Sequence, residues 1–324
     1  MVYCEKIILP THRAIIRCSY TKQGEFVMLL LRSLLFMPGN QARMLEKGTR
    51  LFPDAYIPDM EDSVPPEEKS IAREVTSRYL DRLSNNGPLV IPRVNSLDSG
   101  FLEDDLETLI RPSIFGVSVG KIHDAGDIVE ISKIIRKIED IKNLSKGSIK
   151  LIPWIETAKS IINCYEICTS SPRIVAAAFG AEDFTDDMGI ERTSEETEIR
   201  FARNSIAVAA RAADVLALDT PYFSFKDAEG LKLNALKAKN LGFKGKFAIH
   251  PDQVKILNES FAPSKSEIDY AKEVITVFDE AVKNGRGSTS LRGEVIDIPV
   301  VKRAKNLLRF ADVLESDERP TNGK

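Results

Sequence analysis

Two acidic side chains that follow apolar runs are the first candidates for chemistry in this chain. Residues 149–155 form an apolar run that stops at Glu156, and residues 174–180 form another that leads into Glu182 and Asp183. Short apolar runs bounded by loop-forming residues are typical of strands buried on both faces. An acid at the exit of such a strand is costly unless it holds a cation, a proton or a partner. The pattern therefore favours a site for a hard metal ion.

The spacing of these acids suits a shared site. Glu156 and Asp183 are 27 positions apart, about the length of one strand–helix–strand repeat. Neighbouring parallel strands would then present the two carboxylates side by side. Two carboxylates completed by waters are a ligand set that Mg²⁺ accepts.

Eight apolar runs that end at proline, glycine or a polar residue are predicted to be strands. Most are separated by segments with apolar residues at helical spacings of three and four. This alternation predicts an α/β fold, a (β/α)₈ TIM barrel, with an open doubly wound sheet as the alternative. The open sheet is less favoured because no Gly-x-Gly-x-x-Gly follows any run. The predicted strands are 33–37, 55–59, 89–94, 116–122, 150–155, 174–180, 215–219 and 246–249, and the predicted helices are 66–83, 125–141, 157–168, 194–213 and 227–241.

The predicted fold directs attention to the carboxyl ends of its strands, where barrel enzymes carry their active residues. Nearly every exit here is polar or flexible, which a purely structural barrel would not need. The exits read Pro38-Gly39, Asp59 to Asp62, Arg93 to Asn95, Lys121, Glu156, Glu182-Asp183, Asp219 and His250.

The composition excludes several classes of function. The 324 residues are 43% hydrophobic and 29% charged, as in an ordinary globular protein. A well-mixed net charge of −3 gives no case for binding nucleic acid or an acidic membrane surface. The longest apolar stretch, residues 27–37, is interrupted by Arg32 and is too short to cross a bilayer. The four cysteines suit neither a disulfide framework nor a zinc site, which favours a reducing compartment.

We expect three sections along the chain: an N-terminal extension at 1–30, a barrel at 31–258 and a C-terminal helical arm at 259–324. The first 28 residues are mildly basic, so they are either a mitochondrial transit peptide or an extension from a start codon placed too early. Without a transit peptide the expected location is the cytoplasm. A Gly/Ser-rich stretch at 284–290 predicts a flexible joint, so we expect the arm to act as a lid or to dock on a neighbouring subunit.

Seven short strings carry a resemblance to a known family. Together they resemble the citrate lyase β-subunit-like proteins of the HpcH/HpaI aldolase/citrate lyase superfamily, which include malyl-CoA and citramalyl-CoA lyases. The resemblance covers about residues 31–312. It implies a Mg²⁺-dependent barrel, commonly trimeric, that cleaves or forms carbon–carbon bonds in acyl-CoA thioesters. The strings are residues 32–40, 59–62, 92–95, 155–157, 179–183, 248–251 and 293–299.

The resemblance assigns the central roles residue by residue. Glu156 and Asp183 match the family's metal ligands, and Arg93 matches an arginine that binds substrate and stabilises the enolate. Asp297 matches an aspartate that reaches a neighbouring subunit's site and handles the proton of the acyl methyl group. The sequence alone leaves a second interpretation of Asp297 open, a helix N-cap before Pro299.

Five further residues are candidates for contacts with substrate or CoA. Arg32 would contact CoA or substrate, and the turn at Pro38 and Gly39 would bring backbone amides to the CoA phosphates. Glu61 and Asp62 would orient metal-bound water or bind Arg93, or they would be plain salt-bridge partners.

The predicted activity is Mg²⁺-dependent cleavage or formation of a 3-hydroxyacyl-CoA such as malyl-, citramalyl- or citryl-CoA. Its partners would be an acyl-CoA thioester, a 2-oxo acid and further copies of this chain, as a trimer or a dimer of trimers. Three alternatives stay open: a malyl-CoA thioesterase, a citrate lyase β subunit that acts on citryl-acyl carrier protein, and a non-catalytic scaffold.

Overall fold

The computed structural model describes residues 29–316, in two units. The first unit is Leu29–Phe261, and the second begins at Ala262 and includes the rest of the described residues. The predicted N-terminal extension therefore lies outside the described residues, except for its last two positions.

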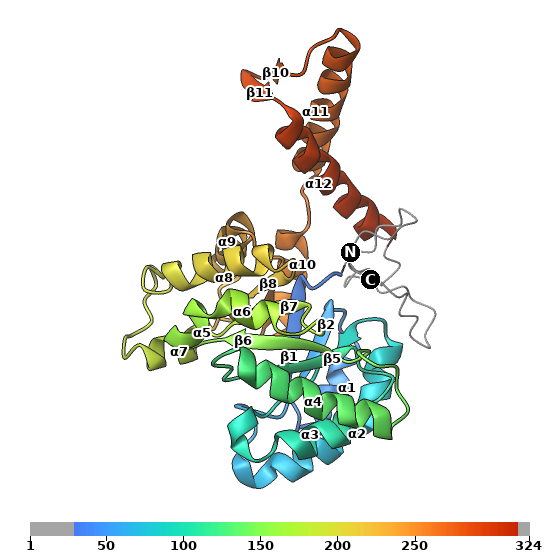
Figure 1. The fold of residues 1–324 in the computed structure, drawn as a ribbon, viewed down its shortest axis with the longest axis vertical. Helices are drawn as coiled ribbons and strands as arrows, with labels where there is room; N and C mark the ends of the chain where they lie inside the picture. Colours follow the sequence, from blue (N-terminus) through green and yellow to red (C-terminus); the bar gives the residue numbers. More distant parts are fainter. Residues whose placement is uncertain (1–28, 317–324) are drawn as a thin grey trace. The chain divides into compact units, whose positions relative to one another are not determined.

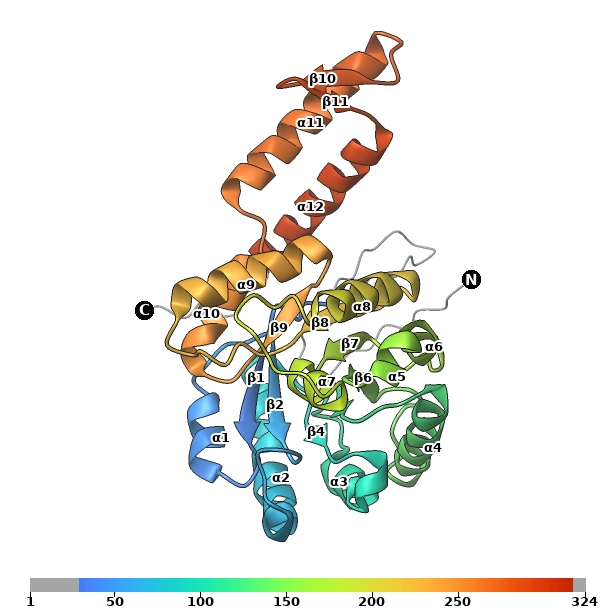
Figure 2. The ribbon, with the colours of Figure 1, turned by 90° about the vertical axis from the view of Figure 1, so that its left-hand side faces the viewer.

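The first unit is a closed parallel barrel, as the sequence predicts (Figures 1 and 2). β1 pairs in parallel with both β2 and β9, which closes the sheet. β3 and β4 follow one another along the same edge of β2, so together they are one of eight barrel strands. The strands are β1 (Ser33–Pro38), β2 (Ala55–Asp59), β3 (Leu89–Val90), β4 (Arg93–Val94), β5 (Gly116–Val119), β6 (Lys150–Ile155), β7 (Ala176–Phe179), β8 (Leu216–Asp219) and β9 (Gly245–Ala248).

Helices follow the strands and cover the outside of the barrel (Figure 2). The predicted helix at 157–168 is divided at Asn163, and the helix predicted from residue 194 begins at Arg200. The segments are α1 (Ala42–Gly48), η1 (Pro66–Glu68), α2 (Lys69–Asn85), η2 (Leu97–Ser99), α3 (Leu102–Leu109), α4 (Ala125–Ile141), α5 (Ala158–Ile162), α6 (Cys164–Thr169), α7 (Ala181–Asp187), α8 (Arg200–Ala212), α9 (Ala228–Leu241) and α10 (Pro251–Phe261).

Aromatic rings fill the barrel interior near its carboxyl end. Phe36 from β1, Trp154 from β6 and Phe247 from β9 pack together, with ring centroids 4.4–5.9 Å apart. Such offset and tilted pairs add to the apolar burial of each ring. The Trp154 indole N–H donates to Ser118 Oγ on the neighbouring strand (2.6 Å), which fixes the orientation of the ring. These three rings, the aromatic floor, close the barrel beneath the strand exits.

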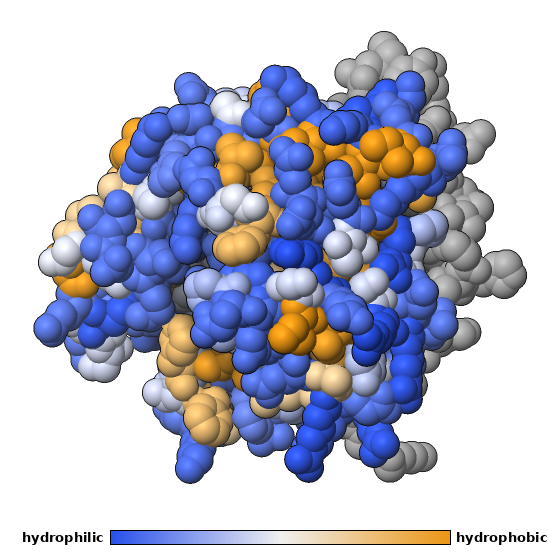
Figure 3. Space-filling model, turned by 90° about the horizontal axis from the view of Figure 1, so that it is seen from below, coloured by the Kyte–Doolittle hydropathy of each residue, from blue (hydrophilic) through white to orange (hydrophobic). Residues whose placement is uncertain are grey.

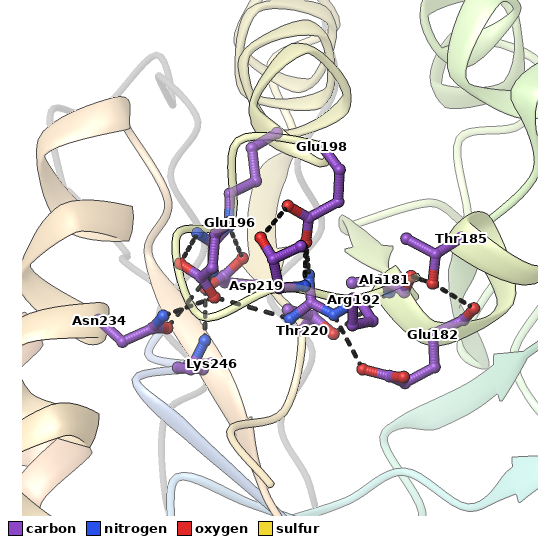
Figure 4. A network of polar contacts seen from close by, with 12 residues as sticks. Ala181, Glu182, Thr185, Arg192, Glu196, Glu198, Asp219, Thr220, Asn234 and Lys246 are labelled. Atoms are coloured by element: carbon purple, nitrogen blue, oxygen red, sulfur yellow. Dashed lines mark hydrogen bonds and ion pairs between the residues drawn. The ribbon is translucent and has the colours of Figure 1, made fainter. Parts of the chain in front are cut away.

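A buried polar cluster lies on the opposite, helix-facing side of β8 and β9 (Figure 4). Successive side chains of β9 point to opposite faces of the sheet, and Lys246 points away from the barrel interior. Its Nζ donates a hydrogen bond to Asp219 Oδ2 at 2.6 Å. Arg203 from α8 donates to both oxygens of the same carboxylate at 3.0 Å. Both Lys246 and Asp219 are fully buried. The polar exit at Asp219 is therefore explained by a structural network between the barrel and its helices.

The second unit has its own small apolar core, which includes Val274, Ile296 and Val301. It consists of α11 (Lys265–Lys283), the antiparallel strands β10 (Thr289–Leu291) and β11 (Glu294–Ile296), and α12 (Ile298–Ser316). The joint predicted at 284–290 is wrong at its last two residues, which belong to β10 and pair in a hairpin, and the flexibility of the rest stays a prediction. Arg292 and Gly293 both have positive φ (52° and 85°), as a two-residue hairpin turn of type I′ requires.

The surface mixes polar and apolar side chains. On the face shown in Figure 3, several separate hydrophobic areas lie among mainly hydrophilic residues. Within residues 29–316, none of the helices combines the length and the apolar character that a membrane span needs.

The buried cluster gives a first prediction. Lys246→Met removes one cation and leaves the acids of the cluster under-compensated, so we expect unfolding to become easier by about 3–5 kcal/mol. Urea denaturation followed by circular dichroism measures this change. Arg211→Met breaks an exposed ion pair with Asp214 and should leave the midpoint almost unchanged. Equal midpoints for Lys246→Met and the unsubstituted protein would contradict the assignment.

Candidate functional site

Seven charged side chains converge at the carboxyl end of the barrel. They come from neighbouring positions in the sheet, since the strands lie in the order β2, β4, β5, β6 and β7. Five of them are among the residues that the sequence selected, and Asp59 and Lys121 join them. The seven are Asp59, Glu61, Asp62, Arg93, Lys121, Glu156 and Asp183.

Arg93 is the fixed cation at the centre of this group. Its Nε and Nη2 donate to the two oxygens of Asp59, both at 2.7 Å, and its Nη1 donates to Asp62 Oδ2 at 2.9 Å. The guanidinium carbon lies 4.8 Å from the ring centroid of Phe36 and 5.7 Å from that of Trp154. Burial alone would lower the pKa of Arg93, but the acids, led by Asp59, raise it. The guanidinium is therefore always charged and is held on the aromatic floor.

Asp59 organises the segment that follows β2. Burial would raise the pKa of Asp59, but Arg93 holds it below its ordinary value. The Asp59 carboxylate also accepts hydrogen bonds from the backbone N–H groups of Glu61 (2.9 Å) and Ser63 (3.1 Å). From the other side, buried Lys69 Nζ donates to the carbonyl oxygens of Met60 and Glu61, both at 2.7 Å. The backbone around Glu61 is thus fixed by two buried charges.

Glu61 is a buried carboxylate with unused hydrogen-bonding capacity. Its Oε2 lies 3.2 Å from Arg93 Nη1, and its Oε1 lies 3.6 Å from Lys121 Nζ, beyond hydrogen-bonding distance. Among the described residues, Oε1 has no hydrogen-bond partner. Burial raises the pKa of Glu61 to about 7, although Arg93 opposes the shift. A cation or a donated proton would complete its environment.

Glu156 lies directly after β6 and is 4% exposed. Its Oε1 accepts a hydrogen bond from the backbone N–H of Lys121 (2.5 Å), a residue with positive φ (55°). A Cβ at Gly180 would come within 2.2 Å of Glu156 Oε2, so glycine is needed there. Burial, together with the negative charge of Asp183, raises the pKa of Glu156 to about 8.

Asp183 lies in the first turn of α7 and is open to solvent. Partial burial of its carboxyl, with the nearby charge of Asp62, raises its pKa above the ordinary value. The backbone N–H at the start of α7, on Ala181, donates to Thr220 Oγ1 after β8 (3.2 Å). The helix start is in this way tied to the next strand.

This arrangement fits a divalent cation. Glu156 and Asp183 repel one another, and Glu61 has a buried oxygen without a hydrogen bond, so the cluster lacks positive charge despite Arg93 and Lys121. Between residues 29 and 316, no group of three or more His, Cys, Asp or Glu side chains is arranged to hold a metal. Two carboxylates are nevertheless enough for Mg²⁺, which keeps several waters or substrate oxygens.

Three residues that the sequence selected, Arg32, Pro38 and Gly39, are not part of this cluster of charged side chains. Arg32 precedes β1 at the amino end of the barrel, where its guanidinium donates to buried Asp54 at 2.8 Å. The Gly39 N–H donates to the Asp59 carbonyl (2.8 Å), and the Pro38 carbonyl accepts from Gln41 N–H (3.2 Å). The turn thus supports the segment after β2, and we leave Arg32, Pro38 and Gly39 out of the proposed site.

Asp297 belongs to the second unit. Its carboxylate accepts a hydrogen bond from the Val300 N–H (3.1 Å), and its carbonyl accepts one from Val301. Asp297 is therefore the N-cap of α12, with Pro299 in the first turn. Within a single chain Asp297 acts as a helix cap, and its catalytic role in a neighbouring subunit's site stays a prediction.

Sequence reasoning missed two supporting residues. Asp59 was part of a quoted string but had no role, although its position as the last residue of a buried strand was a usable signal. Lys69 gave no signal, because its contact with the Glu61 carbonyl crosses from a helix start to the preceding loop.

Comparison with known proteins shows which family this chain belongs to. Residues 32–251 match the HpcH/HpaI aldolase/citrate lyase family. The chain is 37% identical over 284 residues to the citrate lyase subunit beta of Haemophilus influenzae, covering 88% of this chain and 98% of that protein. It is 31% identical to the human mitochondrial citramalyl-CoA lyase, covering 91% and 89% respectively.

Solved structures of related proteins have a similar fold. The CitE protein of Mycobacterium tuberculosis, in complex with magnesium, acetoacetate and coenzyme A, is 25% identical, with a TM-score of 0.72 over 86% of this chain and 97% of that one. A citrate lyase from Burkholderia xenovorans has a TM-score of 0.79 at 19% identity, covering 88% and 93%, and supports the fold.

The raised pKa of Glu156 predicts how stability depends on pH. Between pH 5 and 8 the folded metal-free protein keeps a proton that the unfolded chain, with its ordinary value of 4.5, has lost. Raising the pH should therefore lower the free energy of unfolding, by at most about 1.4 kcal/mol per pH unit for one group. Urea unfolding in EDTA at each pH measures the slope. Glu156→Gln should make the slope shallower, with a remainder from Glu61, whose pKa is raised to about 7, and an unchanged slope would contradict the prediction.

Proposed function

Since the chain belongs to the HpcH/HpaI aldolase/citrate lyase family, we propose that it is a Mg²⁺-dependent carbon–carbon lyase of acyl-CoA thioesters. The substrate class is a 3-hydroxyacyl-CoA such as malyl-, citramalyl- or citryl-CoA. The products would be acetyl-CoA and a 2-oxo acid, and the same groups would catalyse the reverse condensation. Glu156 and Asp183 are the proposed metal ligands.

One observation carries the proposal: an under-compensated acid cluster lies beside a fixed guanidinium at the carboxyl end of the barrel. Glu156 and Glu61 are buried with raised pKa values, and Arg93 lies within 3.2 Å of Glu61. A metal would compensate the acids, while Arg93 would stabilise an anion. Cleavage of a 3-hydroxyacyl thioester needs both, because it polarises one oxygen and leaves an enolate on another.

We assign each residue of the candidate site one role in this reaction. Mg²⁺ bound at Glu156 and Asp183 would polarise the carboxylate and adjacent oxygen of the hydroxy-acid half. Glu61, with an oxygen that lacks a hydrogen bond, would accept the hydroxyl proton. Arg93, held by Asp59 over the aromatic floor, would stabilise the enolate of the thioester. Asp297 of a neighbouring subunit would protonate that enolate.

Several finer points belong to the same proposal. We propose a homo-oligomer, a trimer or a dimer of trimers, in which the arm at 259–324 completes a neighbour's site. The location would be the cytoplasm, or the mitochondrion if residues 1–28 are a transit peptide. The 37% identity to citrate lyase β subunits favours one second candidate, action on citryl-acyl carrier protein within a larger complex.

The metal ligand gives the first test. Glu156→Gln keeps the size of the side chain but removes its charge, so Mg²⁺-dependent cleavage should fall by at least about 100-fold while circular dichroism stays unchanged. The assay offers malyl-, citramalyl- and citryl-CoA with Mg²⁺ and identifies the released 2-oxo acid by mass. Glu130→Gln, an exposed carboxylate on α4, is the matched control.

Each outcome of this assay has a meaning. Normal turnover by Glu156→Gln would reject the metal site. Release of free CoA without an oxo acid would indicate a thioesterase instead. Activity that requires other subunits would indicate a citrate lyase complex. The absence of both turnover and Mg²⁺ binding would favour the alternative of a non-catalytic scaffold.

Asp297 allows the cap and the chemistry to be separated. Asparagine caps helices as well as aspartate does, so Asp297→Asn should preserve α12 and the thermal stability. It should nevertheless stop the exchange of acetyl-CoA methyl protons with D₂O, which NMR follows, because the amide cannot accept the proton. Asp297→Ala, which loses both functions, is the comparison. Normal exchange in Asp297→Asn would leave Asp297 with the cap alone.

A further inference from the structure

We propose that Arg192 is a positioning residue: it holds the first turn of α7, and thereby Asp183, in place for the metal. The inference rests on the Mg²⁺ site proposed above. It concerns a residue in the loop between α7 and α8 that touches none of the seven charged groups of the candidate site.

The first turn of α7 is held on one side by the apolar core, where Ala181 and Phe184 are buried. The helix has seven residues, its N-cap residue Gly180 provides no side-chain cap, and two acids, Glu182 and Asp183, lie in its first turn. Helices this short are not stable by themselves, so external contacts decide where the turn lies. One such contact is the hydrogen bond from Ala181 N–H to Thr220. This bond and the core packing fix the buried side of the turn, whereas Glu182 and Asp183 lie on its exposed side.

Arg192 supplies a contact on the exposed side of this turn. Its Nε donates to Glu182 Oε1 at 3.0 Å. Its Nη1 lies 3.4 Å from Glu198 Oε1, and its Nη2 lies 3.6 Å from Glu196 Oε1. The Arg192 side chain is 22% exposed, and its guanidinium joins the residue before Asp183 to two acids of the following loop (Figure 4).

The far side of this link is anchored in the buried polar cluster. Glu196 Oε2 accepts from Arg203 Nη1 at 2.7 Å, and Glu196 Oε1 accepts from Asn234 at 2.8 Å. Arg203 in turn binds Asp219, which Lys246 also contacts. The chain of contacts therefore runs from β8 and β9, through the loop, to the turn that carries Asp183. A contact tied to a rigid, buried group positions its partner better than a free surface pair does.

The alternative is that Arg192 and Glu182 form an ordinary surface pair, since the Glu182 side chain is 49% exposed. The sign of a charge effect separates the two. Removing a cation near a metal site should tighten metal binding by Coulomb attraction alone. Losing the position of a ligand should weaken it. A weaker metal affinity after removal of Arg192 therefore cannot come from the lost charge.

The experiment measures binding of Mn²⁺, as a paramagnetic substitute for Mg²⁺, by the EPR signal of the free ion. Arg192→Gln should weaken the affinity about two- to fivefold, which corresponds to the loss of one ion pair. Arg136→Gln, which removes an exposed arginine paired with Asp140 on α4, should leave it unchanged. Circular dichroism and thermal unfolding establish that each variant folds.

Glu182→Gln tests the same link from the other side, and it serves if Arg192→Gln does not fold. It removes an acid near the metal, so its charge effect is matched by Asp186→Asn, an exposed acid one turn further along α7. We expect Glu182→Gln to bind Mn²⁺ about two- to fivefold more weakly than Asp186→Asn does. The double variant Arg192→Gln/Glu182→Gln should be no weaker than Glu182→Gln alone, because both changes break one link.

The outcomes are distinct. Unchanged or tighter binding by Arg192→Gln, or equal binding by Glu182→Gln and Asp186→Asn, overturns the positioning role. If the unsubstituted protein does not bind Mn²⁺, or if Glu156→Gln binds it normally, the proposed metal site itself fails.

Discussion

The ion pair between Asp59 and Arg93 is the interaction on which the candidate site depends. Asp59 is buried, the Arg93 side chain is 11% exposed, and two 2.7 Å hydrogen bonds join the guanidinium to the two carboxylate oxygens. The pair joins the exits of β2 and β4 and packs Arg93 against Phe36 and Trp154. Because Asp59 also binds the backbone after β2, the same contact sets where Glu61 lies. A buried ion pair adds little net stability, so its main effect is to fix the positions of Arg93 and of the segment after β2.

The fold could be predicted from the sequence because its signals are local and repeated. Each buried strand is a short apolar run, and the alternation with helical segments allows few architectures. The failures occur where one residue changes a local rule. Pro92 has no N–H and interrupts the third strand into β3 and β4. The hairpin of β10 and β11 was missed because its turn places Arg292, an unusual residue for positive φ, before Gly293.

The candidate site was predicted in part, for a related reason. Acids directly after buried strands are visible in a sequence, so Glu156, Asp183 and Glu61 were found. Their supports are contacts between distant segments, such as Lys69 with the Glu61 carbonyl, and no spacing rule reports them. Arg32 was selected by its string, but the register of the barrel places it at the amino end, where it binds Asp54. The sequence thus indicates which charged groups are expensive to bury, and the structure shows which contacts compensate their charge.

The aromatic floor has a consequence for following this protein in solution. Trp154 is the single tryptophan of the whole chain, and it lies 5.7 Å beneath the Arg93 guanidinium. Its indole N–H is fixed by Ser118, so the ring has one orientation toward the charges above it. Indole emission responds to the local electric field, and every photon from tryptophan in this protein originates at the candidate site. The chain therefore contains a built-in optical reporter of whatever enters the barrel mouth, without any label.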